Sequence, residues 1–468
     1  MKIFEVDFDE KLSPVAMFSV VREKFGRPSA LLESLSFDEK NKMSIIAACP
    51  RREIVSSEDS FRKIREELGK CRKFPADFPF AGGLIGYFNF EIFNEIEPKH
   101  ARKYDEDEID NRHPNAIFYE FSRFVFFDHE RQKIIFVLFE NDLVVEDFEQ
   151  DCLALLEDAR NKFIDSFEMT RKGDLEKFKG DELADYSKFT FDQTYEEFEG
   201  KVETAKQKIL DGEIFQMIIS NGFKRDCGKT DGLKFYEVLR ELEPTTHLFY
   251  LDFAEKGQVV GASPEILGSK RGKKVLYRPI AGTRFRGKDA AEDEVILDKM
   301  KNNEKENAEH DMLLDLGRND LGRICKTGSI KIAKEKYGKF FANVMHLISD
   351  LTGEIDDDNF DAVDFFKAIF PAGTLTGAPK IRAVEVINEL EKFPRKLYGG
   401  AVGYFSVDGN MEFAIAIRSF FLNDGIARFR VGAGIVQDSK SKDEWLEIHN
   451  KAKSLAKVFN YVLAMKNE

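Results

Sequence analysis

AIFYEFSRFVFFDHE (116–130) and KIIFVLFEN (133–141) are two runs rich in aromatic and β-branched residues, and only two residues separate them. Such a composition favours β-strands. SIIAAC (44–49) and GGLIGYFNF (82–90) have the same character. We therefore interpret all four runs as strands of one antiparallel sheet.

The first part of the chain, residues 1–170, alternates these strands with charged helices, which are predicted within 51–75 and over 146–167. A charge-rich segment, 168–190, is a candidate boundary loop or linker. Residues 190–468 form a second region. The length of 468 residues is compatible with two domains or with one large intertwined domain.

The composition excludes several classes of function. The chain has 71 basic and 85 acidic residues, a net charge of −14, which argues against general binding to nucleic acids or anionic membranes. No apolar run approaches the roughly 18 residues of a membrane-spanning helix. The acidic start, MKIFEVDFDEKL, lacks the plan of a secretion signal, and the five cysteines are scattered. We expect a cytoplasmic protein with neither nucleic acid nor membrane as a partner.

The stretch FPAGTLTGAPK (370–380) has two glycines that bracket two threonines, and Pro379 and Lys380 open an amphipathic run. Proline is tolerated in the first turn of a helix. The pattern predicts a glycine-hinged loop that leads into a helix N-terminus, where free N–H groups favour an anion. An ordinary loop-to-helix junction is the alternative. A phosphate-binding P-loop is excluded, because Lys380 lies three residues beyond the second glycine.

Two pairs of glutamates are each spaced three residues apart in runs with helical periodicity: Glu306 with Glu309, and Glu444 with Glu447. Each pair therefore lies on one helix face. Most such pairs are solvated surface residues. Two pairs near glycine-rich loops are a better candidate for Mg²⁺, because that ion takes oxygen ligands and often bridges to an anionic substrate.

The run RPIAGTRFRG (278–287) places Arg284 and Arg286 beside a flexible backbone. This arrangement suits carboxylate recognition, although exposed arginines are usually only solvated. His346 lies among apolar neighbours, where a lone histidine is more often a core residue than a catalyst. Gly432 and Gly434 allow close approach of a ligand to the backbone. Together these features suit a Mg²⁺-dependent enzyme that acts on a small polycarboxylate.

Many motifs occur in a fixed order over residues 190–460: ASPE, PIAGTR, EHDMLLDLGRNDLGR, VMH, PAGTLTGAPK, YGGAVGY, AIAIR, GAGIV and NKA. In this order the chain resembles the chorismate-utilising enzymes, and within them the large subunits of anthranilate synthases. The first half matches through LLES (31–34) and GGLIGYF (82–88). The resemblance implies an α+β fold in which two antiparallel sheets pack as a sandwich flanked by helices. The N-terminal region would be the regulatory and partner-facing side, and residues 190–468 the chorismate-binding catalytic side.

The resemblance also implies roles for individual positions. The Mg²⁺ site would consist of four acids: Glu306, Glu309, Glu444 and Glu447. The catalytic residues would be His346, Glu265 as general acid for the departing ring hydroxyl, and Thr374. The substrate would be bound by Gly282, Thr283, Tyr398, Arg418, Gly432, Ala433, Gly434 and Lys451.

The implied reaction adds ammonia at ring carbon 2 of chorismate as the hydroxyl at carbon 4 leaves, and pyruvate is then eliminated. Ammonia would come from glutamine through a separate amidotransferase subunit, because the chain has no G-x-C-x-G nucleophile motif. Gln216 stands where isochorismate and salicylate synthases carry a water-activating lysine, and glutamine cannot act as that base. Ala281 and Thr374 differ from the lysine and serine frequent in aminodeoxychorismate synthases, which remain the alternative.

The feedback site of the resembling enzymes pairs LLES with an NPSPYM segment, which here reads EPTTHL (243–248). Ser34 and Val402 are retained, whereas Leu248 replaces the usual methionine. Inhibition by L-tryptophan is therefore an open expectation. A non-catalytic amino-acid sensor on the same fold is a further alternative, although all four metal-site glutamates are present.

Overall fold

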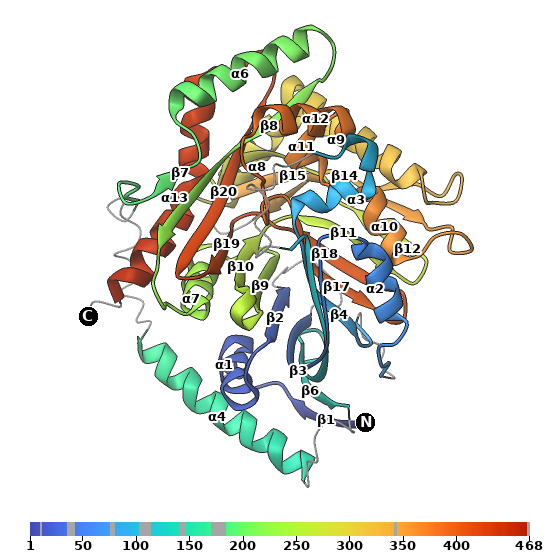
Figure 1. Ribbon diagram of the computed structural model, residues 1–468, viewed down its shortest axis with the longest axis vertical. Helices are drawn as coiled ribbons and strands as arrows, with labels where there is room; N and C mark the ends of the chain where they lie inside the picture. The colour runs from blue at the N-terminus through green and yellow to red at the C-terminus, as the bar shows by residue number, and fades with distance from the viewer. Residues whose placement is uncertain are drawn as a thin grey trace.

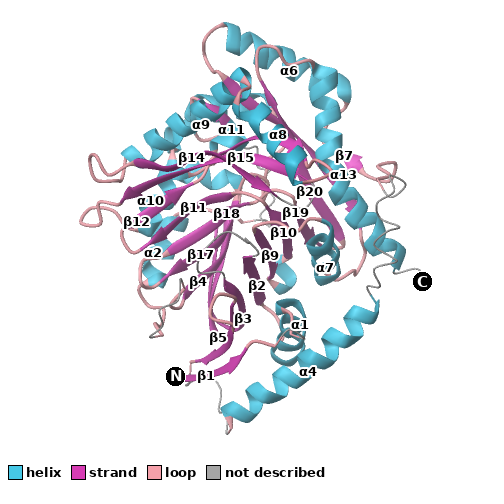
Figure 2. Ribbon diagram, turned by 180° about the vertical axis from the view of Figure 1, so that it is seen from behind, coloured by secondary structure: helices cyan, strands magenta, loops and turns pink. Residues whose placement is uncertain are grey.

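A computed structural model of the chain describes residues 1–9, 12–34, 43–74, 80–102, 114–139, 147–169, 184–340 and 344–465 (Figure 1). Helices and antiparallel strands are mixed, and the strands form an open hydrogen-bonded network (Figure 2). The predicted α+β class is confirmed. No helix in these ranges is long and apolar enough to cross a membrane.

Strand β5 (Ala116–Asp128) is the point at which the network branches. It pairs along its length with β3 (Met43–Ser56), and on its other edge with β4 (Gly83–Phe88) and then β6 (Lys133–Leu138), beyond which lies β1 (Lys2–Asp7). Every residue of β5 is buried. Burial on both faces explains why this aromatic run shows no polar alternation. The four strands predicted in the first half are confirmed.

Two series of strands, here called the first arm and the second arm, diverge from this branch point. The first arm continues from β3 through β2 (Ser29–Ser34), β9 (His247–Asp252), β10 (Gln258–Ser263), β19 (Ser419–Asn423), β20 (Ile426–Ile435) and β8 (Gln216–Asp226). Short strands β7 (Thr190–Phe191) and β16 (Gly377–Ala378) pair with β8.

The second arm continues from β4 through β17 (Ala401–Ser406), β18 (Met411–Ile415), β11 (Ile266–Arg271), β12 (Lys274–Tyr277) and β15 (Val344–Glu354). Strands β13 (Ile280–Phe285) and β14 (Lys331–Phe340) pair with β15. The hairpin predicted to turn at 408–410 is formed by β17 and β18.

The two arms face each other across a shared core. Tyr87 and Val402 of the second arm belong to the same buried cluster as Leu251, Val259 and Phe421 of the first arm. The implied two-layer sandwich is therefore present, with both layers joined through β5. Because β2 pairs with β9 and β4 with β17, the N-terminal and C-terminal parts of the chain share each layer.

Helices cover the outer faces of both arms (Figures 1 and 2). The first arm is covered by α13 (Ser441–Met465), α6 (Tyr195–Leu210), α7 (Gly232–Leu242) and α1 (Pro14–Phe25), against which α4 (Phe148–Met169) packs. The second arm is covered by α2 (Ser60–Leu68), α8 (Ala290–Lys301), α9 (Glu304–Gly322) and α10 (Ala362–Ile369). The other helices of the described residues are η1 (Phe90–Ile92), α3 (Phe93–Ile96), η2 (Pro98–His100), η4 (Ala254–Lys256), α11 (Gly373–Thr376) and α12 (Lys380–Leu390).

The helices expected within 51–75 and over 146–167 correspond to α2 and α4. Of the candidate linker 168–190, residues 170–183 lie outside the described ranges.

Candidate active site

The central contact of the candidate site joins Glu265 to Thr374. Glu265 lies in the short connection between β10 and β11, and Thr374 lies on α11. The Thr374 hydroxyl donates a hydrogen bond of 2.9 Å to Glu265 Oε1. Burial raises the pKa of the Glu265 carboxyl to about 8, although the hydrogen bond from Thr374 acts in the opposite direction. Glu265 is therefore largely protonated at neutral pH and can donate a proton.

A close backbone approach fixes the stretch that carries Thr374. Gly377 pairs with Met217 of β8 at a φ of +135°. A Cβ at Gly377 would lie 2.0 Å from the carbonyl oxygen of Gln216. Only glycine fits there, because both the dihedral angle and the space exclude a side chain. The glycine predicted to be a hinge therefore locks the stretch onto the sheet.

Lys380 anchors the same stretch from its other end. Its ammonium group is buried and donates to Asp320 Oδ2 at 2.7 Å and to the carbonyl of Ile369 at 3.1 Å. These bonds tie the start of α12 to α9 and to the end of α10. Lys380 therefore forms an internal ion pair and does not face a ligand.

His346 lies on β15, opposite Thr283 of β13 in the register. Its Nδ1 is 3.2 Å from the carbonyl oxygen of Gly282. A carbonyl only accepts hydrogen bonds, so Nδ1 carries the proton and Nε2 keeps its lone pair. Burial, and to a smaller extent the nearby charge of Arg418, lower the pKa of His346 to about 4. The imidazole is neutral at pH 7 and can act as a base.

Glu306 lies in the first turn of α9, directly beside Gly282. A Cβ at Gly282 would lie 3.0 Å from Glu306 Oε2. Glu306 Oε1 accepts a hydrogen bond from Arg284, whereas Oε2 is buried and has no hydrogen-bond partner among the described residues. A buried carboxylate oxygen without a partner is costly unless a ligand satisfies it. This oxygen is the feature of the site that best fits a cation.

The other predicted metal ligands are distributed over two helices. Glu309 follows Glu306 on α9, while Glu444 and Glu447 lie on α13. Glu444 accepts a hydrogen bond of 2.7 Å from Ser439, and Glu447 pairs with Lys451 at 2.6 Å. Within the described ranges, no group of three or more His, Cys, Asp or Glu side chains is close enough to hold a metal ion. The carboxylates suit Mg²⁺ chemically, but this conformation does not assemble both pairs.

The antiparallel pair of strands β8 and β20 supplies the substrate-binding positions expected around Gly432. Gly432, Ala433 and Gly434 pair with residues 218–220 of β8. A Cβ at Gly432 would lie 2.6 Å from the Tyr398 hydroxyl oxygen, so this phenol rests on the glycine backbone. The Gly432 carbonyl accepts a hydrogen bond of 3.0 Å from Lys451.

Arg418 precedes β19 and has a φ of +47°. Its guanidinium donates to Glu243 at 2.8 Å. Of the predicted substrate-binding residues, only Thr283 has a side chain that is not described, although its backbone is in register on β13.

The chain was compared with known families and structures. The family model described as chorismate binding enzyme matches residues 29–457. The chain belongs to this family.

Relatives within the chorismate-binding enzyme family include anthranilate synthase component 1 of Aquifex aeolicus, which is 36% identical over 93% of this chain and 86% of its own length. The corresponding protein of Lactococcus lactis is 35% identical over 98% of this chain and 99% of its own length. The crystal structure of anthranilate synthase component I from Streptococcus pneumoniae matches with a TM-score of 0.71 at 31% identity, covering 96% of this chain and 99% of that one. The isochorismate synthase MenF of Escherichia coli, at 17% identity and a TM-score of 0.70, shares the fold.

A buried arginine that the sequence did not single out holds parts of this candidate site together. Arg395 donates to the carbonyls of Leu375 at 2.6 Å and Ile218 at 2.8 Å, and forms a fork with Glu391. Its guanidinium lies 5.7 Å from the centre of the Tyr398 ring. Arg395 thereby ties α11, β8 and Tyr398 together. A lone arginine in a connecting segment is usually solvated, so the sequence carried no signal.

The expected feedback residues lie in different parts of the fold. Glu33 pairs with Leu248, and the backbone of Ser34 pairs with His247. Leu248 is buried in the core beneath the helices, whereas Val402 is buried between the arms. The structure therefore does not bring Leu248 and Val402 into one cluster. The side chain of Ser34 is outside the described part of the chain.

Proposed function

We propose that this chain is the large subunit of an anthranilate synthase. The reaction would be Mg²⁺-dependent amination of chorismate with ammonia, followed by elimination of pyruvate, as the first step of tryptophan biosynthesis. The relatives that cover nearly all of this chain carry that name. The observation that carries the proposal is the Glu265–Thr374 pair, because it holds a protonated carboxyl ready for a leaving hydroxyl.

Glu265 would act as the general acid. Hydroxide is a poor leaving group, so proton transfer to the ring oxygen as its bond breaks lowers the barrier. Thr374 fixes the orientation of the carboxyl through its hydrogen bond to Oε1. The neutral imidazole of His346 would then accept the ring proton at carbon 2 as pyruvate leaves and the ring becomes aromatic.

The carboxylates of chorismate would be held by groups at opposite ends of the site. Tyr398, Arg418 and the backbone around Gly432–Gly434, including Ala433, would bind the enolpyruvyl carboxylate. Gly282 and Thr283 would complete the pocket near the ring. Lys451, which donates a hydrogen bond to the Gly432 carbonyl, would face the ring carboxylate.

The ring carboxylate would be bound next to the four glutamates. Glu306, Glu309, Glu444 and Glu447 would hold Mg²⁺, which when bound supplies positive charge for that carboxylate. The buried Oε2 of Glu306 supports this assignment. In the described conformation Arg284 and Lys451 provide the counter-charges of Glu306 and Glu447.

Ammonia, not water, would be the nucleophile. Gln216 contributes its carbonyl to the contact with Gly377, and its amide side chain cannot serve as a base for water. Ammonia would be delivered from glutamine by a separate amidotransferase subunit, component II. We assign the reaction to the cytoplasm, and we assign regulation and partner contact to residues 1–170.

We expect L-tryptophan to bind at the segment around Leu248; Ser34 and Val402 are the other expected contacts, although Val402 is buried in a different cluster from Leu248. Beside Leu248, the hydroxyls of Thr245 and Thr246 and Nδ1 of His247 are buried without hydrogen-bond partners in the described structure. Buried polar atoms of this kind are satisfied when a polar ligand binds. Isothermal titration with tryptophan tests this role, and the absence of binding would remove it.

The main test is incubation of the chain with chorismate, Mg²⁺ and ammonium. We expect the blue fluorescence of anthranilate. Accumulation of aminodeoxychorismate would identify the folate-pathway alternative, and isochorismate would show that water is the nucleophile. Binding of chorismate without any turnover would identify a non-catalytic sensor.

A further inference from the structure

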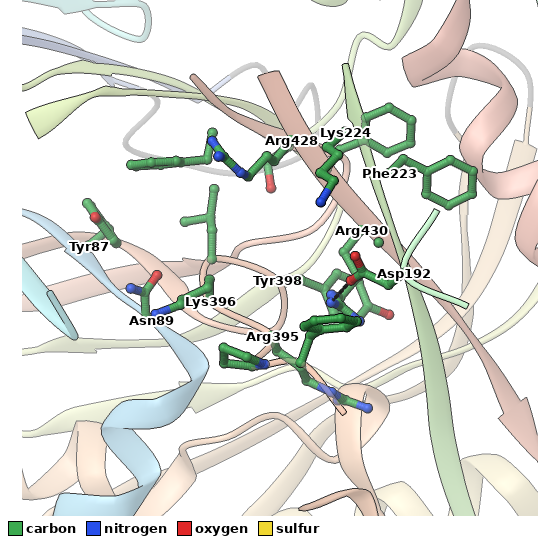
Figure 3. A pocket seen from close by; sticks show the side chains of 17 residues that line it. Tyr87, Asn89, Asp192, Phe223, Lys224, Arg395, Lys396, Tyr398, Arg428 and Arg430 are labelled. Carbon is green, nitrogen blue, oxygen red and sulfur yellow. Dashed lines mark hydrogen bonds and ion pairs between the residues drawn. The ribbon is translucent and has the colours of Figure 1, made fainter. Parts of the chain in front are cut away.

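A cavity lined by β8, β20 and the segment that leads from α12 to β17 shares Tyr398 with the proposed chorismate site (Figure 3). Its volume is about 360 Å³. In the register of this strand pair, Lys224 lies opposite Arg428 and Gly222 lies opposite Arg430. Gly432 lies on the same face, two residues further along β20. The opposite wall is the segment that leads from α12 to β17. Glu265, Thr374, His346 and the four predicted metal ligands do not line it.

The deep part of this cavity is aromatic and apolar. Tyr87, Leu397, Tyr398 and Phe421 line it and are all buried. The hydroxyl of Tyr87 is buried and has no hydrogen-bond partner in the described structure, which leaves a donor without an acceptor. An apolar interior with few polar groups is typical of pockets that bind small molecules.

The polar part of the cavity lining is strongly basic. Five basic side chains line it, namely Lys224, Arg395, Lys396, Arg428 and Arg430, whereas Asp192 is its one acidic lining residue. Arg430 pairs with Asp192, and Arg395 pairs with Glu391. The ammonium groups of Lys224 and Lys396 form no ion pair with any described residue. In a chain with a net charge of −14, such a local excess of positive charge marks a site for an anion.

We propose that this cavity binds a small aromatic carboxylate, with its ring against Tyr87 and Phe421 and its carboxylate attracted by the two lining lysines that form no ion pair, Lys224 and Lys396. Nucleic acid and anionic membrane do not fit, because the apolar surface lies inside a cavity. Tyr398 lines the cavity and also rests on Gly432 of the substrate site. Occupancy therefore changes substrate affinity through Tyr398 without blocking Glu265.

The test measures binding to the full chain in the absence of Mg²⁺. Benzoate is titrated calorimetrically, and anthranilate by its fluorescence anisotropy. We expect one Mg²⁺-independent binding event. The double substitution Lys224→Gln/Lys396→Gln should weaken it at least tenfold, because both charges that face the carboxylate are removed. Tyr87→Phe, which keeps the ring and removes the unpaired hydroxyl, should weaken it about threefold.

The matched control is Lys229→Gln, an exposed lysine in the turn after β8 that does not line the cavity. It should leave the affinity unchanged. No Mg²⁺-independent binding, or binding that the lining substitutions leave intact, would overturn the proposal. Circular dichroism of each variant establishes that it is folded. Since the titration needs no turnover, its failure is separable from a failure to form anthranilate.

The source of the carboxylate follows from a second pair of titrations. Tighter binding of anthranilate than of L-phenylalanine identifies the product of the reaction, whereas the reverse order identifies an amino-acid effector. Both orders support the aromatic carboxylate chemistry. In steady-state assays the bound carboxylate should give mixed inhibition against chorismate, and the double lysine variant should lose this component. Purely competitive inhibition, equal in the double variant, would contradict a second site.

Discussion

At the scale of single residues, burial decides the chemistry of this site. Glu265 and His346 are both enclosed by apolar structure, and burial acts on them in opposite directions along the pH scale. The pKa of Glu265 rises to about 8 and that of His346 falls to about 4. Both groups are consequently neutral at pH 7, one as an acid and the other as a base. Pairs of groups whose pKa values are shifted apart in this way are typical of acid–base catalysis.

Glu265→Gln should keep the shape of the site and remove the transferable proton. We expect kcat for anthranilate formation to fall about 10²–10⁴-fold. The KM for chorismate should change little. Thr374→Ser, which keeps the hydroxyl, serves as the control and should retain most activity. A Glu265→Gln variant with more than half of the original kcat would exclude the general-acid role.

The pH dependence follows from the same carboxyl. Its acid form is lost as pH rises through about 8, so kcat should decline there in the original chain. The pKa is raised on folding from its ordinary value of 4.5, so the folded state binds the proton more tightly. Stability should therefore fall as pH rises from about 4.5 to about 8. Thermal melts at pH 5 and pH 8.5 check this, since Glu265→Gln should reduce the difference between them.

At the scale of elements, short strand β16 and the segment around Arg395 hold the proposed catalytic and binding groups in place. Neither is a large element, and each depends on one contact with β8. Gly377 supplies the close approach of β16, and Arg395 supplies the hydrogen bonds that join α11 to β8. The geometry of Thr374 and Tyr398 therefore depends on residues that do not touch the substrate.

Gly377→Ala should separate β16 from β8. The new Cβ would meet the Gln216 carbonyl at 2.0 Å, and the φ of +135° is strained for alanine. We expect a loss of about 3 kcal/mol or more in urea unfolding, together with a large drop in kcat. Gly212→Ala is the matched control, because its φ is +75° and nothing lies within 4 Å. It should cost only about 1 kcal/mol, and equal losses in both variants would show that strain alone is responsible.

Arg395→Met should leave Glu391 buried without its partner. Removing one member of a buried ion pair typically costs about 3–5 kcal/mol. Chemical unfolding should show a loss of this size, and kcat should fall because Leu375 and Tyr398 lose their tether. The double variant Arg395→Met/Glu391→Met should recover part of the stability but not the activity. Recovery of both would mean that Arg395 has no positioning role.

At the scale of the whole molecule, the two parts of the chain complete one sandwich. The first arm needs β2 beside β9, and the second arm needs β4 beside β17. Between the arms, Tyr87 from the first part packs in the same core as Phe421 from the second. The two regions, which the sequence allowed to be one intertwined domain, therefore both contribute strands to each layer.

A fragment of residues 190–468 should consequently not fold by itself. It would expose the edges of β9 and β17 and the core between the arms, and exposed edges of this kind promote aggregation. We expect an insoluble product on separate expression. Coexpression with residues 1–169 should restore solubility and anthranilate formation. A soluble, cooperatively melting fragment would show that the second region is an independent domain.

The sequence by itself determined much of this protein. The aromatic runs of the first half, the hairpin at 408–410 and the helices that carry both glutamate pairs follow from local composition and period, which depend on neighbouring residues alone. The family is evident from motifs in a fixed order.

Only the tertiary structure decided the rest. Partners far away in the chain decide the protonation of Glu265 and the ion pair between Lys380 and Asp320. They also decide the hydrogen bonds of Arg395 and the placement of Leu248 and Val402 in different buried clusters. Burial and ion pairing depend on residues that come together only in the folded chain, and local sequence patterns do not encode them. The basic cavity beside the site has the same origin, because its lysines come from two segments that only the fold brings together.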